Sequence, residues 1–214
     1  MAIKILEKRK YWLVALVLCA VYFFPVPARA ENGKGAFFHV GPSLWVPFAG
    51  NEKSSGSFLG IAKTSIDTGY GFQIGGGYDF GLLGISTSFH YANFQRNITG
   101  AIHDGGDDRS KLYVFDIDTK IFPLGLSSLA DAPLRPYLIV GGNALFMDSA
   151  SGLLGDGYGF GGNFGVGLGL HLSHFFLTLE NTYRPLRIMA TDPWISRDYT
   201  LHVYQGSLNV GFHF

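Results

Sequence analysis

Hydrophobic and polar residues alternate along most of the chain after residue 35, and this period of two is typical of β-strands whose faces meet different surroundings. The clearest example is the stretch 157–172, GYGFGGNFGVGLGLHL. Its even-numbered positions from Phe160 to Leu172 are mostly large and apolar, whereas the odd-numbered positions are glycine, Asn163 or His171. The segment 200–214 repeats this division, so each strand has one apolar face and one small or polar face.

The same glycines match the spacing of a nucleotide-binding motif, but the alternating residues after them do not support that motif. Gly157, Gly159 and Gly162 fit G-x-G-x-x-G. That fingerprint requires a buried strand before it and a helix after it. Here the residues that follow continue to alternate, so the stretch predicts a strand with a small-residue face.

Eight segments of this kind predict eight strands. They are residues 36–47, 68–80, 82–95, 111–122, 135–147, 157–172, 174–187 and 200–214. Their connections alternate in length. Tight turns lie at 79–82 and 172–174, a medium connector at 123–134, and longer polar segments at 48–66, 96–110, 148–156 and 188–199. Bacterial membrane barrels have short periplasmic turns and long extracellular loops, and an even strand number places both termini in the periplasm.

We therefore predict an all-β fold, an eight-stranded antiparallel transmembrane β-barrel, over a secreted β-sandwich. Charges occur in mid-strand on the small or polar face, opposite an apolar face. Glycines on the small face suit a narrow interior that side chains fill. Aromatic residues gather near strand ends, where membrane girdles lie. These are Trp45, Phe48, Tyr78, Phe80, Phe122, Tyr137, Tyr158, Tyr183, Phe212 and Phe214.

The first 30 residues predict a cleaved signal peptide, and residues 31–214 the barrel. A basic start precedes the apolar run YWLVALVLCAVYFF, and PVPARA then supplies an A-x-A cleavage site at Ala28 and Ala30. The alternative is a retained anchor, but a run of about 14 residues is shorter than the ~20 that span a bilayer. Export followed by insertion predicts a location in the bacterial outer membrane.

Charge and cysteine content argue against some classes of function. Five of the 16 basic residues and one of the 16 acidic residues lie in the first 30, which leaves 11 basic and 15 acidic residues. The remaining chain is acidic and shows no basic patch, so no nucleic-acid partner is expected. The single cysteine, Cys19, lies in the signal segment, so we expect no disulfide framework or cysteine chemistry.

The C-terminus carries a more specific resemblance. The segment SLNVGFHF, which ends at Phe214, resembles the terminal strand of small outer-membrane barrels of the OmpA/OmpX type: polar-x-Gly-x-x-aromatic-x-aromatic. Ser207, Phe212 and Phe214 match this assembly signal, whereas Asn209 stands where glycine is usual. The resemblance extends over the whole mature chain and implies handling by periplasmic chaperones and the barrel-assembly machinery.

Candidate chemistry concentrates in the predicted lumen. One strand places Asp116, Asp118 and Lys120 inward, and another places Glu180 and Arg184 there. Buried charges must pair, so this lumen charge network predicts a salt-bridged plug, with a gated narrow ion path as the alternative. The leading function is therefore structural or surface interaction through the loops, with outer-membrane lipid and lipopolysaccharide as partners. A narrow porin-like channel for ions or small solutes is the first alternative.

Catalytic and metal sites are weakly supported. His171 and His174 flank a turn beside Ser173, which leaves a lipid-modifying barrel enzyme as a third alternative, but adjacency alone does not make a nucleophile and base. Asp104, Asp107 and Asp108 lie among glycines in one loop but lack the EF-hand spacing for calcium. We expect no catalytic residues, no metal and no cofactor, and the sequence leaves the oligomeric state open.

Overall fold

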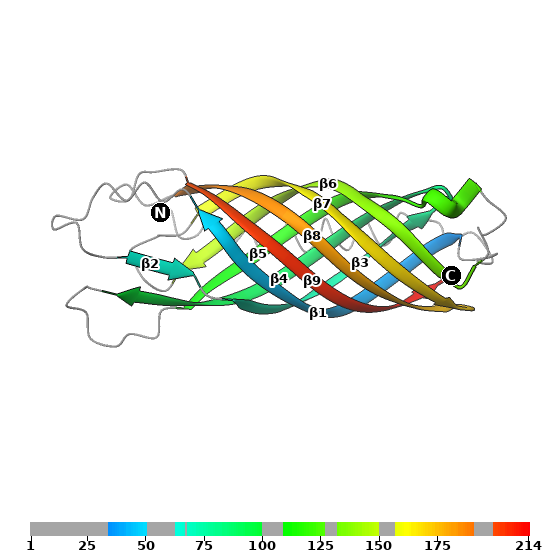
Figure 1. Ribbon diagram of the computed structural model, residues 1–214, viewed down its shortest axis with the longest axis horizontal. Coiled ribbons are helices and arrows are strands. Elements are labelled where there is room, and N and C mark those ends of the chain that lie inside the picture. Colours follow the sequence, from blue (N-terminus) through cyan, green and yellow to red (C-terminus); the bar gives the residue numbers. More distant parts are fainter. Residues whose placement is uncertain are drawn as a thin grey trace, which may run out of the picture.

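The computed structural model describes residues 34–50, 63–66, 68–99, 109–126, 132–149, 157–190 and 199–214, and these form a β-barrel (Figure 1). The strands are β1 (Gly35–Gly50), β2 (Lys63–Ile66), β3 (Gly69–Asp79), β4 (Leu83–Thr99), β5 (Arg109–Ile121), β6 (Leu134–Ser149), β7 (Gly157–Leu172), β8 (Phe175–Ala190) and β9 (Tyr199–His213). A short 3-10 helix, η1 (Pro123–Leu126), follows β5. No helix in these segments is long and apolar enough to cross a membrane.

The sheet closes on itself. All strand pairs among the described residues are antiparallel, β9 pairs with β1, and β4 pairs with both β3 and β5. The short β2 pairs with β4, the same strand that β3 pairs with, and so lies in line with β3 instead of adding a further strand around the barrel. The prediction of a closed eight-stranded antiparallel barrel is therefore confirmed.

The strands extend further than the sequence pattern predicts at one end. We call the end where β1, β4, β6 and β8 finish the loop end, and the end where β3, β5, β7 and β9 finish the turn end. β4 continues to Thr99, and Lys63 to Ile66 pair with it inside a segment expected to be loop. Backbone pairing needs only a neighbouring strand, so it continues where the alternation of side chains has already stopped.

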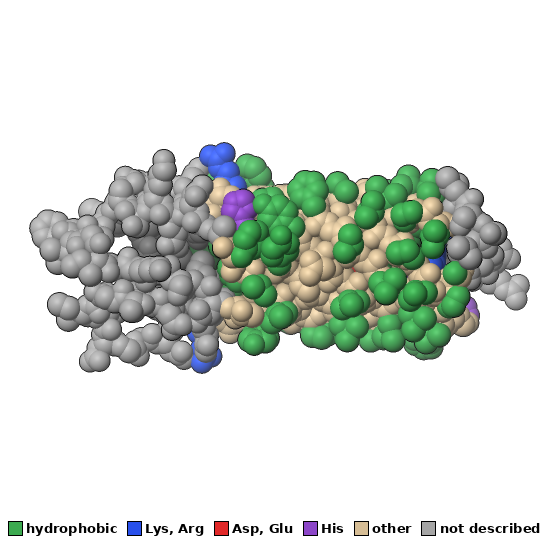
Figure 2. Space-filling view, in the orientation of Figure 1, with side chains coloured by type: hydrophobic (Ala, Val, Ile, Leu, Met, Phe, Trp, Pro, Cys, Tyr) green, Lys and Arg blue, Asp and Glu red, His purple; other side chains and the backbone are tan. Residues whose placement is uncertain are grey.

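The two faces of the strands separate as predicted. Outward side chains are mostly large and apolar and form a band around the barrel, which Figure 2 shows as hydrophobic side chains along its length. Inward side chains are mostly buried. In β7, Phe164, Val166 and Leu168 are exposed on the outside, whereas Asn163 is fully buried inside. This arrangement suits a barrel in a lipid environment, because the apolar outer faces of the strands would contact the hydrocarbon chains of the lipids.

Three residues assigned to the aromatic girdle lie inside the barrel instead. Trp45 has no exposed surface, Phe122 is 6% exposed and Tyr137 is 3% exposed. The girdle prediction is wrong for these three residues. A residue's place along a strand does not determine which face of the strand its side chain lies on. Trp45, for example, shares its inward parity with His39 and Ser43, which are also buried.

Two turn-end connections use residues with positive φ. Gly81 has φ of 101° in the turn between β3 and β4, a conformation that favours glycine. Its N–H donates to the Asp79 carboxylate at 2.6 Å, which holds the turn. Ser173 has φ of 59° in the turn between β7 and β8. Both positions correspond to the tight turns that the sequence predicts.

An inner-face glycine also makes room for an aromatic ring. Gly167 on β7 is the Cα partner of Tyr137 on β6, and a Cβ built on Gly167 would overlap the Tyr137 ring. The Tyr137 hydroxyl in turn donates to Glu180 Oε1 at 2.7 Å. The absence of a side chain at residue 167 therefore allows the ring to lie where it can reach the lumen carboxylate.

We predict that Gly167→Ala lowers the free energy of unfolding by about 1–3 kcal/mol, because the new methyl group displaces the Tyr137 ring. Gly206→Ala is the matched control, since a Cβ built on Gly206 meets no atom within 4 Å. Urea-dependent unfolding in lipid vesicles measures both. Equal, small effects of the two substitutions would show that the close approach of Gly167 and Tyr137 is unimportant.

Candidate functional site: the lumen

All five residues of the predicted lumen charge network lie inside the barrel. Asp116, Asp118 and Lys120 come from β5, and Glu180 and Arg184 come from β8. Each of them is at most 9% exposed. The residues on a strand are separated by two or four positions, and this spacing keeps them on the same face of a strand.

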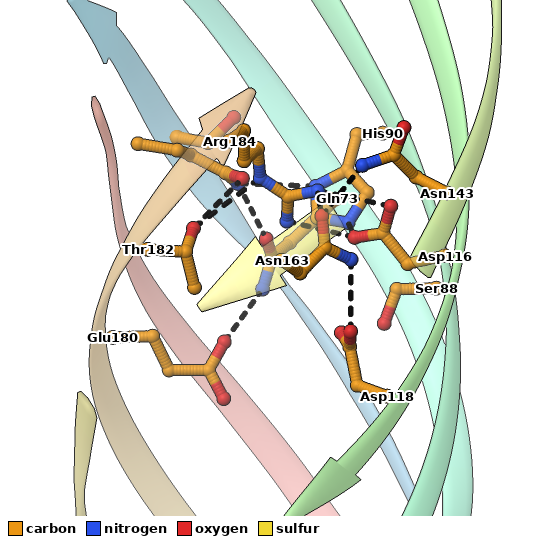
Figure 3. Close-up of polar contacts among 12 residues, drawn as sticks. Gln73, Ser88, His90, Asp116, Asp118, Asn143, Asn163, Glu180, Thr182 and Arg184 are labelled. Atoms are coloured by element: carbon orange, nitrogen blue, oxygen red, sulfur yellow. Dashed lines mark hydrogen bonds and ion pairs between the residues drawn. The ribbon is translucent and has the colours of Figure 1, made fainter. Parts of the chain in front are cut away.

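The structure joins Asp116 and Arg184 in a two-point ion pair (Figure 3). Arg184 Nη1 donates to Asp116 Oδ1 at 2.9 Å, and Nη2 donates to Oδ2 at 2.7 Å. His90 Nε2 lies 2.6 Å from the same Oδ2. Such planar, bidentate contacts are the strongest form of this interaction, and both side chains here are nearly without exposed surface.

Amide side chains extend this pair across the lumen. Asn163 accepts a hydrogen bond from Arg184 Nη1 at 2.8 Å. Gln205 Nε2 donates to Gln73 Oε1 at 3.0 Å and lies 3.0 Å from His90 Nδ1. Because these residues come from β3, β4, β7 and β9, the network connects strands on different sides of the barrel.

A second ion pair lies closer to the turn end. Lys120 Nζ is 2.7 Å from Glu180 Oε1, which also accepts the Tyr137 hydroxyl. The Lys120 ammonium lies 5.0 Å from the centre of the Tyr137 ring. Gln73 Nε2 donates to Asn209 Oδ1 at 2.7 Å and lies 3.5 Å from Glu180 Oε2, so this pair is connected to the first one.

Asp118 is the member of the set that the structure does not bring to a cation. Its Oδ1 accepts a hydrogen bond from Asn163 Nδ2 at 2.8 Å. Among the described residues, no ion pair is formed by this carboxylate. The five predicted residues therefore form two ion pairs, and Asp118 belongs to neither of them. The spacing of Asp116 and Asp118 in the sequence could not show which of the two would meet a cation.

Sequence reasoning missed a third buried ion pair at the turn end. Arg135 Nη1 lies 3.2 Å from Asp79 Oδ2, and Nη2 donates to the Gly81 carbonyl at 3.1 Å. The guanidinium is 4.6 Å from the centre of the Phe122 ring. Parity contained the signal, because Arg135 has the same parity as the inward Tyr137 and Ile139.

An apolar layer at the loop end of the lumen was also missed. It is a single cluster of buried side chains formed by Trp45, Ala92, Phe94, Leu112, Val114, Leu145, Met147, Leu186, Ile188, Leu201 and Val203. Its boundary with the ionic network is a cation–π contact, since Arg184 lies 5.2 Å from the Trp45 ring centre. The inner face therefore has an apolar layer towards the loop end with the ionic network below it, and it is not polar throughout.

The predicted assembly signal occupies both faces of β9. Ser207 is buried inside, whereas Phe212 and Phe214 contact each other at 5.3 Å between ring centres near the turn end. Asn209 stands where the terminal-strand pattern usually has glycine. It is fully buried and donates to Thr178 Oγ1 at 3.1 Å. The asparagine thus contributes to the lumen hydrogen bonds, while recognition of this strand by the assembly machinery stays a prediction.

The remaining candidates do not form a site in the described residues. His171 and Ser173 lie at the turn between β7 and β8, and no hydrogen bond described there joins Ser173 to His171 or His174. No three His, Cys, Asp or Glu side chains in the described segments are grouped to hold a metal ion. Ala28 and Ala30, and the loop residues Asp104, Asp107 and Asp108, lie outside these segments.

Neither a protein-family model nor a curated protein sequence matches the chain. Solved structures do match it. The outer membrane protein OprG from Pseudomonas aeruginosa aligns with a TM-score of 0.59 at 18% identity, covering 85% of this chain and 96% of that one. Neisserial surface protein A aligns with a TM-score of 0.50 at 15% identity, covering 85% and 100%. The chain therefore has the fold of the small eight-stranded outer-membrane β-barrels.

Proposed function

We propose that the protein is a bacterial outer-membrane barrel with a sealed lumen, which acts through its outer surface and its loop end. The observation that supports this proposal is the filling of the lumen. An apolar layer lies at the loop end, and buried ion pairs lie below it. The similar solved structures are outer-membrane proteins, which supports the same membrane.

The sealed lumen separates this proposal from the channel alternative. An ion crossing the barrel would have to pass Trp45 and Leu112 in the apolar layer and then break the Arg184–Asp116 pair. Eight-stranded barrels have interiors that side chains fill, whereas porins with a water channel have about 16–18 strands. A passage through this lumen would therefore need a different packing of its side chains.

The proposal also specifies the orientation of the barrel in the membrane. Lys34 and Phe214 lie at the turn end, where β1 begins and β9 finishes. Export by a cleaved signal peptide at Ala28 and Ala30 would place this end in the periplasm, where chaperones and the assembly machinery would meet the terminal strand. The loop end would then face the cell exterior and the lipopolysaccharide leaflet. The proposal includes no catalytic step.

We predict that the refolded chain, residues 31–214, gives no discrete conductance steps in planar bilayers, because the ion pairs and the apolar layer close the lumen. A heat-dependent gel shift confirms beforehand that the sample is folded. Reproducible steps from folded protein, with a size that changes in Arg184→Gln, would replace the sealed barrel with a narrow channel.

We predict that Arg184→Ala lowers the free energy of unfolding by about 3–5 kcal/mol, because it leaves the Asp116 carboxylate buried without its cation. The double variant Arg184→Gln/Asp116→Asn should lose less than the two single neutral substitutions together, since neither charge is then left alone. Lys111→Gln, an exposed charge on the outer face of β5, serves as the control with little expected effect.

Urea unfolding of all five variants (Arg184→Ala, Arg184→Gln, Asp116→Asn, the double variant and Lys111→Gln) in the same vesicles provides the comparison. Additive losses in the double variant would mean that the two side chains act independently. A loss in Lys111→Gln as large as in Arg184→Ala would mean that the assay reports overall charge and not the lumen pair.

A further inference from the structure

An amide side chain interrupts the apolar outer face of the barrel. Asn181 on β8 is exposed and points outward, since the flanking Glu180 and Thr182 are buried in the lumen. Its Cα partners are Val166 on β7 and Gly206 on β9, both on the outer face. The Val166 side chain is 57% exposed. The amide therefore has apolar neighbours on a surface that lipid would cover.

The amide lies within the apolar band and not beyond its edge. Towards the turn end, the next outward side chains on β8 are Leu179 and Leu177, and both are exposed. Towards the loop end, the next outward side chain is Tyr183, whose ring packs beside that of His202. Such aromatic rings lie at the boundary between lipid chains and headgroups, so Asn181 is on the lipid-chain side of this boundary.

The described residues offer the Asn181 side chain no polar partner. No hydrogen bond within this part of the chain reaches its amide, and the neighbouring Tyr183 hydroxyl lies 2.7 Å from His202 Nδ1 instead. Asn93 on β4 also points outward, but its Cα partner on β5 is the exposed Lys111 near the loop end. An unpaired amide in hydrocarbon is costly. Asn181 therefore needs a donor and an acceptor from another molecule at the same depth.

A position without a side chain lies beside this amide. Gly206 is on the outer face of β9, between Asn181 on β8 and Leu44 on β1. A Cβ built on Gly206 meets no atom within 4 Å, so the row of outward side chains has a gap here. Between membrane helices, small residues allow close approach and polar side chains hydrogen-bond across the contact. The same physical reasons apply to a contact between two barrels.

The chemistry of an amide selects a second copy of the same chain as the partner. Asn181 Nδ2 donates and Oδ1 accepts, so two such side chains related by a two-fold axis complement each other with two reciprocal hydrogen bonds. A two-fold axis along the membrane normal also places the same residue of both copies at the same depth. Lipid chains offer neither a donor nor an acceptor.

The surroundings of Asn181 do not oppose such a contact. The outward side chains of β8 from Phe175 to Tyr183, and of β9 from Tyr204 to Phe212, carry no charge. We propose that the protein forms a two-fold dimer in the membrane, in which the outer faces of β8 and β9 meet around Asn181 and the Gly206 gap. This inference rests on the membrane location in the proposed function and not on the sealed lumen.

Another polar side chain on the outer face provides a matched control. Thr87 on β4 is exposed between the buried Ser86 and Ser88, and the strand order places it on the opposite side of the barrel from β8. It also has a glycine partner, Gly76 on β3. A Cβ built on Gly76 would lie 2.7 Å from a backbone oxygen, so no comparable gap is open there. Thr87 therefore tests whether any outward polar group promotes association.

The experiment measures association of refolded residues 31–214 in lipid vesicles, by energy transfer between chains labelled at the N-terminus with a donor or an acceptor. The protein-to-lipid ratio is varied, and a heat-dependent gel shift shows that each variant is folded. We expect wild type to reach a dimer and no larger species. Asn181→Leu should weaken association about tenfold, because both reciprocal hydrogen bonds are lost. Gly206→Leu should weaken it by filling the gap, and Thr87→Val should retain it.

Cysteine cross-linking tests which faces meet. Residues 31–214 contain no cysteine, so one introduced thiol reports on one position. Leu179→Cys, the next outward position to Asn181, should give a disulfide-linked dimer in vesicles under mild oxidation. Adding Asn181→Leu to this variant should reduce the cross-linked fraction. Ile117→Cys, whose native side chain is 57% exposed on the outer face of β5, should stay monomeric.

Several outcomes would overturn the dimer. Equal association of Asn181→Leu and wild type would do so, as would equal losses in Asn181→Leu and Thr87→Val. A folded wild type that stays monomeric at the highest protein-to-lipid ratio would also overturn it. Oligomers that grow without limit would show a contact between two different faces in place of the two-fold one. Failure of the chain to insert into vesicles would instead refute the membrane location in the proposed function, so the two failures are distinguishable.

Discussion

The buried ion pair between Arg184 and Asp116 illustrates the constraint on which the rest of this barrel depends. A narrow closed barrel has little room for water inside, so a buried inward charge needs polar partners within the lumen. The two residues are 68 positions apart in sequence, yet they meet with contacts of 2.7 and 2.9 Å. Amides from Asn163, Gln73 and Gln205 extend the network to further strands.

The same constraint explains the glycines on the inner face. The large Tyr137 ring fits inside the barrel because its partner on the neighbouring strand, Gly167, has no side chain. The ring then holds Glu180 beside Lys120. Glycine is unfavourable in a strand by itself, so its repeated use in β7 is explained by space and not by strand propensity.

The filled lumen supports the proposal that the protein acts through its outer surface. Apolar packing around Trp45 covers the ionic network at the loop end, and Arg135 with Asp79 covers it at the turn end. The outer surface offers ordered aromatic side chains and exposed cations where the apolar band ends. The inward charges therefore pair with one another inside the barrel, whereas the outer face is mostly apolar.

The sequence by itself determined the number of strands around the barrel, their approximate ends and the inward direction of Asp116, Lys120, Glu180 and Arg184. These follow from a period of two, which is a local property of a strand. Only the tertiary structure decided that Arg184 meets Asp116 while Asp118 has no cation, that Trp45 and Tyr137 face inward as lumen residues, and that one end of the lumen is apolar. Such contacts depend on the stagger of strands around the closed barrel, which sets the height of each residue against residues far away in sequence.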